Sequence, residues 1–296
     1  MDAASPQSPP PPAPAVRVQG LGRSFRVGLG LRRRPALVDL DFELPRGETI
    51  ALVGPNGSGK STLLRVLAGV DEPSCGALEV LGSSPRSARS RLAYLPEGSP
   101  FPAELSALAN LELLGSLHGM RRGETRERAL PLLETVGLAE RARAPLRTYS
   151  KGMLRRFGLA QAFLTDPELI LLDEPTAGLD APGFLVLDQL LDGARRRGAT
   201  VVLASHILSD IHDRCGHLLL LLGGKVAAQG SPRELLAVEG RTTLELEGLG
   251  AAGQNELRGW LEEQGAEVLR MLPAARSLLE LYRGAEGDAG SRGGHA

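Results

Sequence analysis

The residues best suited to chemistry lie in one glycine-rich stretch that fits the pattern G-x-x-x-x-G-K-[ST]. Its glycines allow positive φ angles, so that successive backbone N–H groups can point inward and bind an anion. Lys60 is then placed to reach the β- and γ-phosphates of a nucleotide, and the Ser61 hydroxyl is placed to bind Mg²⁺. The predicted binding loop, with the threonine that follows it, is Gly54, Pro55, Asn56, Gly57, Ser58, Gly59, Lys60, Ser61 and Thr62.

Two elements must position this loop. The apolar run 49–53 predicts a buried strand before it, and residues 62–68 predict a helix after it, whose positive end would face the phosphates. A glycine-rich turn that merely contains Lys-Ser is the alternative, but such turns usually lack this strand and helix context. The motif alone does not choose among a kinase, a GTPase and an ATPase.

A second candidate constellation follows another apolar run, residues 169–172. Asp173 at the end of this predicted strand is positioned to hold Mg²⁺ through water. Glu174 can accept a proton from an attacking water molecule. The alternative is that the two carboxylates only cap the end of a strand, which is the less common arrangement for adjacent Asp-Glu in a protein with a phosphate-binding loop.

The composition bounds the class of protein. The chain has 296 residues, with Lys+Arg 34 against Asp+Glu 35 and a net charge of -1, so no global field attracts nucleic acid, which we therefore disfavour as a partner. Cys75 and Cys215 lack metal-ligand spacing and favour a reducing compartment. The aliphatic run 218–222 is too short to cross a bilayer. We expect a soluble chain, with any membrane part supplied by another polypeptide.

Apolar patterning along the chain predicts an α/β protein. Period-two alternation predicts antiparallel strands at 16–19, 25–27 and 37–44, and further strands at 76–81 and 92–97. Short apolar runs at 169–172, 200–204 and 218–222 predict parallel strands buried on both faces. Residues 104–146 have a helical pattern, and Pro131 should end or kink a helix there.

The two ends of the chain differ from this pattern. Residues 1–15 contain six prolines and predict a disordered tail, and the Gly-rich residues 285–296 predict another. Between 241 and 284, strand, helix, strand and helix are expected at 242–247, 255–264, 267–269 and 275–283, as a small α+β appendage. The sequence does not choose among three roles for this appendage: regulation, stabilisation of a dimer, or a simple cap at the end of the domain.

Over residues 16–236 the sequence resembles the ATP-binding cassette (ABC) ATPases. The counterpart of their signature segment is Tyr149-Ser150-Lys151-Gly152-Met153, which looks like a variant typical of exporter-type cassettes. The resemblance implies that Ser150 and the Gly152 backbone, at a helix start, bind the γ-phosphate held by the opposite subunit. It also implies that two cassettes are needed for two complete sites.

Three further segments match the family in the expected order. Ala177-Gly178-Leu179-Asp180 resembles the D-loop that crosses the dimer interface, with Asp180 as the residue carried over. His206, after the predicted strand 200–204, looks like the switch histidine that contacts the γ-phosphate and orients water. Phe25 lies where the family places an aromatic residue against adenine, although a buried strand phenylalanine is a serious alternative.

The main departure from the family is Glu97, at the position where many cassettes carry a glutamine. A carboxylate can ligate Mg²⁺ but cannot donate a hydrogen bond as an amide does. Related exporter cassettes also show Leu-Pro-Glu here, so we interpret Glu97 as a subfamily feature. Four residues downstream are candidates for a groove that receives the membrane subunit, namely Pro100, Phe101, Pro102 and Leu105.

The sequence therefore predicts a P-loop NTPase (RecA-like) core with an antiparallel β subdomain, a helical insert at about 98–165 and the C-terminal appendage. The expected function is ATP hydrolysis (Glu174, His206, Lys60), with ATP and Mg²⁺ (Ser61, Asp173, Glu97), that drives export through separate membrane subunits. We expect a cytoplasmic homodimer on the inner face of the cell membrane. A non-transport cassette, a degenerate cassette and a cassette for copper-site maturation remain as alternatives, and the transported substrate is not readable.

Overall fold

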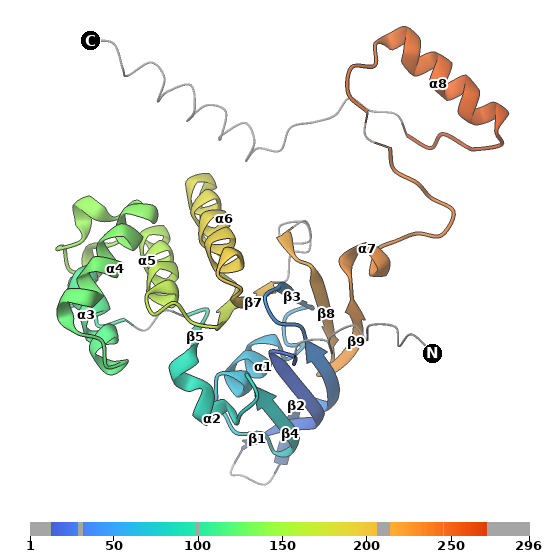
Figure 1. The fold of residues 1–296 in the computed structure, drawn as a ribbon. Coiled ribbons are helices and arrows are strands. Elements are labelled where there is room, and N and C mark those ends of the chain that lie inside the picture. Colours follow the sequence, from blue (N-terminus) through green and yellow to red (C-terminus); the bar gives the residue numbers. More distant parts are fainter. Residues whose placement is uncertain (1–12, 29–31, 99–100, 206–213, 245, 271–296) are drawn as a thin grey trace, which may run out of the picture. The chain divides into compact units, whose positions relative to one another are not determined.

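The structure is a computed structural model that describes residues 13–28, 32–98, 101–205, 214–244 and 246–270 (Figure 1). The chain divides into two compact units, Met1–Leu236 and Ala237–Ala296, each of which is described by itself. Several predicted features fall outside the described residues: most of the N-terminal tail, Pro100, His206, the helix at 275–283 and the C-terminal tail.

A three-stranded antiparallel sheet in the order β2-β1-β4 confirms the predicted antiparallel strands. Its strands are β1 (Val16–Val27), β2 (Arg32–Leu44) and β4 (Cys75–Val80). Two corrections apply here. The strands predicted at 16–19 and 25–27 form one strand, whose register shifts between Val18 and Ser24 let it continue past Gly20, where φ is 56°. Ala15, assigned to the disordered tail, is buried and pairs its backbone with Leu44 and Leu81.

A six-stranded sheet in the order β5-β6-β7-β3-β8-β9 forms the centre of the first unit. The bounds are β3 Thr49–Val53, β5 Leu92–Leu95, β6 Leu169–Asp173, β7 Thr200–Ser205, β8 His217–Leu222 and β9 Lys225–Gly230. The first five of these run parallel, and every residue of β3, β6 and β7 is buried, as predicted for strands covered on both faces. The antiparallel edge strand β9 was not predicted.

Alternate residues of the central strand β3 pack into two different cores. Ala51 and Val53 join a cluster that contains residues of the helices α3 to α6. Ile50 and Leu52 join a cluster that contains residues of β1, β2 and α1. The six-stranded sheet therefore lies between a helical layer and a layer made by α1 and the antiparallel sheet.

Seven helices accompany the sheets of this unit in the described residues. They are α1 Lys60–Leu67, α2 Pro85–Ala88, α3 Ala107–Leu117, α4 Arg122–Thr135, α5 Lys151–Phe163, α6 Ala181–Arg196 and α7 Pro232–Leu235. The helices α3, α4 and α5 lie between β5 and β6 in the chain, where the helical insert was expected. Pro131 does not end a helix: it lies inside α4, and the break between α3 and α4 falls earlier, at residues 118–121.

The second unit holds α8 (Ala251–Glu263), close to the helix predicted at 255–264. The strands predicted at 242–247 and 267–269 are corrected: the described residues of these segments have no strand. A strand needs a neighbour for its backbone groups, and neither segment pairs with another in the described part of this unit. Among the described residues of the whole chain, no helix is long and apolar enough to cross a membrane.

Candidate active site

The glycine-rich loop follows β3 and leads into α1, as the sequence predicted (Figure 1). Its backbone passes so close to other segments that side chains would not fit. A Cβ on Gly54 would lie 2.3 Å from the Leu221 carbonyl oxygen, and one on Gly59, where φ is 107°, would lie 2.8 Å from the Ala36 carbonyl oxygen. Both positions therefore require glycine.

Lys60 is the first residue of α1 and is only 6% exposed. Its Nζ donates to the Gly54 carbonyl oxygen at 2.7 Å, so the side chain curls back over the loop. No side chain caps the start of α1, which leaves its first N–H groups for an anion. The buried Ser58 hydroxyl also has no hydrogen-bond partner in the described part of the chain. These features fit a phosphate-binding loop.

Asp173 ends β6 and is 2% exposed. Burial raises the pKa of this carboxyl above 3.8; a hydrogen bond from Ser61 opposes the shift, and the neighbouring Glu174 and Glu97 add to it. Its Oδ1 is buried and lacks a hydrogen-bond partner among the described residues. A buried carboxylate oxygen without a partner, next to a serine hydroxyl, is a suitable pair of oxygen ligands for Mg²⁺.

Glu174 is held in an unusual backbone conformation next to this carboxylate. Its φ is 48°, which is uncommon for a residue other than glycine, and Glu174 as a whole is only 8% exposed. Its N–H donates to the Ala204 carbonyl oxygen at 2.9 Å, and its own carbonyl oxygen accepts from Ala177 at 3.1 Å. Its Oε1 lies 3.7 Å from Nζ of Lys60. The structure thus brings together three predicted residues, Lys60, Asp173 and Glu174.

Two residues that sequence reasoning missed border this cluster. Arg155, in α5, is 5% exposed and donates to the backbone carbonyl oxygens of Asp173, Glu174 and Pro175. Tyr94, in β5, has a pKa raised to about 12, mainly by burial and then by Asp173. Arg155 had a signal in the sequence, because it shares the buried stripe of α5 with Leu159 and Ala162, where apolar residues are expected.

Phe25 and Glu97 are both exposed. Phe25, in β1, is 37% exposed, and the guanidinium of Arg23 lies 4.7 Å from its ring centroid. The alternative of a buried strand phenylalanine is therefore wrong, while the contact of Phe25 with adenine stays a prediction.

Glu97 lies two residues beyond β5, on the same carboxyl edge of the sheet as Asp173. The charge of Glu97 is one of the smaller causes that raise the pKa of Asp173.

The residues predicted to form the signature and the D-loop lie together, at the starts of α5 and α6. Ser150 is the N-cap of α5, accepting from Met153 N–H at 3.2 Å, and Asp180 is the N-cap of α6. A Cβ on Gly152 would lie 3.5 Å from the Gly178 carbonyl oxygen. In the described residues, Ser150 makes no hydrogen bond with the phosphate-binding loop. Ser205 ends β7 and is buried; His206 after it lies outside the described residues.

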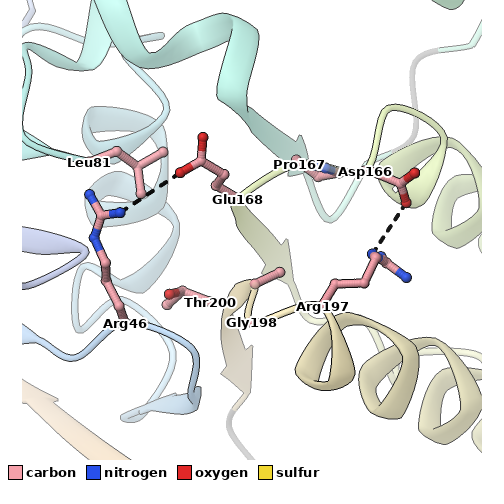
Figure 2. A pocket seen from close by; sticks show the side chains of 9 residues that line it. Arg46, Leu81, Asp166, Pro167, Glu168, Arg197, Gly198 and Thr200 are labelled. Carbon is pink, nitrogen blue, oxygen red and sulfur yellow. Dashed lines mark ion pairs between the residues drawn. The ribbon is translucent and has the colours of Figure 1, made fainter. Parts of the chain in front are cut away.

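Two pockets in the described part of the chain lie away from this cluster. One of about 350 Å³ lies at the amino edge of β6 and β7, opposite the site (Figure 2). Charged residues of both signs line it, with Arg46 3.8 Å from Glu168 and Arg197 3.3 Å from Asp166 (Figure 2). A wider one of about 650 Å³ lies between residues of α4 and α6. Neither contains a residue of the predicted site.

The parallel sheet, the glycine-rich loop before α1 and the carboxylates after β6 define a P-loop nucleotide-binding protein. The family described as "ABC transporter" matches residues 37–177. An uncharacterized ABC transporter ATP-binding protein of Synechocystis sp. is 37% identical over 238 residues, which are 79% of this chain and 67% of that protein. A Nod factor export ATP-binding protein I of Cupriavidus metallidurans is 35% identical over 68% of each chain.

A solved structure has the same fold. It is a dimeric ATP-binding cassette in a post-hydrolysis state, bound to ADP and Pi, with a TM-score of 0.68 and 25% identity over 74% of this chain and 99% of that chain. The chain belongs to the family of ABC transporter ATP-binding proteins, and it is an ATPase. The predicted α/β fold is confirmed.

Proposed function

We propose that this chain hydrolyses ATP as one of two identical cassettes and thereby drives export through separate membrane subunits. The observation that carries the proposal is the cluster of Lys60, Asp173 and Glu174 at the carboxyl edge of the sheet. Lysine, a metal-binding carboxylate and a second carboxylate are the groups that phosphoryl transfer to water requires. A degenerate cassette would be expected to lack one of them.

Each group has a role that its chemistry suits. The N–H groups at the start of α1 and Lys60 hold the phosphates and balance their charge. Ser61 and Asp173 would hold Mg²⁺, with Glu97 as a further candidate ligand, and the ion would neutralise charge on the phosphate oxygens. Glu174 accepts the proton of the attacking water, and His206 is the proposed residue that orients this water. Phe25 would stack against the adenine.

The proposal of a head-to-tail dimer rests on the signature residues. Ser150 and Gly152 stand at an exposed helix start, where N–H groups can bind a phosphate. Because Ser150 makes no hydrogen bond with the described loop of its own chain, a second copy is the natural source of its ligand. The similar cassette that was solved as a dimer supports this arrangement.

The proposed docking surface for the membrane subunit lies before α3. Pro102 and Leu105 are exposed there, whereas Phe101 packs edge-on against Phe157 at 4.9 Å between ring centroids and is half-buried. The buried Asn110 amide donates to the carbonyl oxygens of Pro102 and Leu105 and so fixes the backbone of this surface. A permease bound here would place the chain on the inner face of the cell membrane. Export is supported by the similarity to a Nod factor export ATP-binding protein.

Mixing two inactive variants tests the shared site. Lys60→Ala disables the phosphate-binding loop, and Ser150→Arg blocks the signature. If sites are built from two chains, a mixture of the variants contains one site with both parts intact, and ATP hydrolysis returns although each variant alone is inactive. Wild-type activity should also rise more steeply than linearly with protein concentration. Activity that is linear in concentration, or a mixture that stays inactive while both variants are folded, contradicts the proposed dimer.

A further inference from the structure

Arg155 is a buried cation whose hydrogen-bond partners are all neutral. Its guanidinium donates to five backbone carbonyl oxygens, and within the described residues it forms no ion pair. Nη1 lies 3.1 Å from the carbonyl oxygen of Pro96 and 3.3 Å from that of Glu97, and Nε lies 3.3 Å from the carbonyl oxygen of Pro175. Nη2 donates to the carbonyl oxygens of Asp173 and Glu174. Burial lowers the pKa of Arg155, but an arginine stays protonated in proteins.

These carbonyl groups belong to the two segments that carry the carboxylates of the site. Glu97 follows β5, and Asp173 and Glu174 end β6 and follow it. A carbonyl group and a side chain of one residue are joined through the same Cα, so a bond to the carbonyl also limits where the side chain begins. Only a planar fork with five N–H donors can satisfy this many acceptors from one position.

Glu174 depends most on this support. With φ at 48°, its backbone conformation is costly for a residue other than glycine and persists only where surrounding contacts hold it. Its N–H is bound by Ala204, and its carbonyl oxygen is bound by Ala177 and Arg155. Loss of the guanidinium removes a charged donor from one side of the strained residue. We expect the carboxylate of Glu174 then to be held less firmly in its place beside Lys60.

Arg155 also lies on the helix that begins at Ser150, about 7.5 Å further along the axis at 1.5 Å per residue. We propose that Arg155 is a positioning residue, which fixes the backbone of Glu174 and Glu97 to the helix that carries the signature residues. This inference rests on the proposed function in one respect: if Ser150 binds a nucleotide held by a second copy, that binding is transmitted through Arg155 to the carboxylates of its own chain.

Two substitutions in the full-length protein test the proposal, together with a matched control. Arg155→Lys keeps the positive charge but lacks the planar guanidinium and its five N–H donors. Arg155→Ala leaves space in which added guanidinium can bind. Arg91→Lys is the control, because Arg91 also donates to a backbone carbonyl, that of Leu81, but at the opposite edge of the same sheet. Leu81 lines the pocket drawn in Figure 2.

For Arg155→Lys we expect kcat to fall at least about tenfold, because a misplaced catalytic group costs rate. KM for MgATP should stay within about threefold, because the phosphate-binding loop is not touched. Millimolar guanidinium should restore part of the kcat of Arg155→Ala. Hydrogen exchange should speed up at the amides of Glu174 and Ala177, without loss of protection in β3 or β7. Arg91→Lys should match the wild type in all of these.

Several results would overturn the proposal. They are an unchanged kcat in Arg155→Lys, an equal loss in Arg91→Lys, a change in KM alone, and a loss of exchange protection throughout the sheet, which would indicate general unfolding. If the wild-type protein hydrolyses no ATP, the proposed function fails. The amide exchange of Glu174 and Ala177 in Arg155→Lys still decides the role of Arg155, because that measurement needs no activity.

Discussion

Nζ of Lys60 lies 3.7 Å from Oε1 of Glu174, and these side chains are only 6% and 10% exposed. The lysine belongs to the phosphate-binding loop and the glutamate follows β6, so the pair joins two segments far apart in the sequence. A phosphate bound at Lys60 therefore lies within reach of the carboxylate that we assign to accept a proton from water.

Glu174→Gln should separate binding from hydrolysis. An amide of the same size cannot accept a proton from water, so we expect the rate of ATP hydrolysis to fall by about 10²- to 10⁴-fold. ATP affinity, measured by equilibrium binding, should be retained, and light scattering should detect a dimer with ATP but not with ADP. Hydrolysis near the wild-type rate would show that another residue is the base.

Metal-dependent ATP binding should weaken as the pH falls. The pKa of Asp173 is raised above 3.8, chiefly by burial, and Mg²⁺ binds the ionised carboxylate. We therefore expect the affinity gained from Mg²⁺ to decline as the pH falls toward the raised pKa of Asp173, while the affinity for metal-free ATP changes less. Titration calorimetry at several pH values, in buffers of different ionisation enthalpy, should detect proton release. An Asp173→Asn variant that keeps the same pH dependence would contradict this.

Asp173→Asn should also be more stable than the wild type near neutral pH. A carboxyl whose pKa is raised on folding costs stability above that raised pKa, and the cost disappears as the pH falls below 3.8. Removing the buried charge should therefore gain about 1 kcal/mol of unfolding free energy at neutral pH and nothing in acid. Denaturant melts at the two pH values measure the difference. An equal gain at both would point to packing instead of charge.

Glu97→Gln should retain activity within about threefold, because an amide oxygen remains available as a ligand. Removing this negative charge should lower the pKa of Asp173, since Glu97 is one of the groups that raise it. The decline of Mg²⁺-dependent binding should then move to lower pH. Glu97→Ala is the matched control for the loss of the oxygen ligand, and hydrolysis assays with both variants over a range of Mg²⁺ concentrations distinguish the two effects. A tenfold loss in Glu97→Gln would contradict the prediction.

Gly59→Ala should destabilise the protein by more than about 2 kcal/mol, because strain at positive φ adds to a clash with the Ala36 carbonyl oxygen. Gly82→Ala is the control: its φ is +75°, but nothing lies within 4 Å of an added Cβ, so only about 1 kcal/mol of strain is expected. Urea denaturation of both variants gives the comparison. Equal losses would mean that the close approach of β2 to the loop does not matter.

Asn110→Ala should lower the unfolding free energy by about 2 kcal/mol, because the buried Asn110 amide donates to the carbonyl oxygens of Pro102, Leu105 and Ser106, and the variant loses these bonds. Ser116→Ala is the control on the same helix, since its exposed hydroxyl makes one local bond, to Leu113, and should cost at most about 0.5 kcal/mol. Chemical denaturation measures both. If Asn110→Ala is as mild as the control, the loop before α3 is held by other contacts.

The sequence predicted the elements with strong local patterns. The apolar runs that became β3, β6, β7 and β8, and the loop ending at Lys60 and Ser61, were found because burial on both faces and phosphate binding each leave a short, distinctive pattern. The edge strand β9 was missed, since its residues alternate between exposed and half-buried and few of them are strongly apolar. Pro131 was expected to end or kink a helix, and it does not end one: it lies inside α4, because a missing N–H removes one helix bond without necessarily ending the helix.

The candidate site was predictable as far as it consists of motif residues. The place of Arg155 on the buried stripe of α5 was a signal that it is unusual, but its role depends on five backbone carbonyl groups that only the folded chain brings together. The strands expected at 242–247 and 267–269 show the opposite error. Residues with strand propensity there satisfied a local pattern, but pairing with a neighbouring strand is a property of the fold that local patterning does not supply.

The position of β3 has a consequence for how the protein is made. It pairs with β7 and β8, and the backbone beside it, at Gly47, is bound by Thr200, 153 residues further along the chain. During synthesis, the phosphate-binding loop leaves the ribosome early. The strand before it, β3, cannot pair with β7 and β8 until these strands have also been synthesised. A nascent chain that stops before β7 would carry the complete loop sequence and still lack the sheet that holds it.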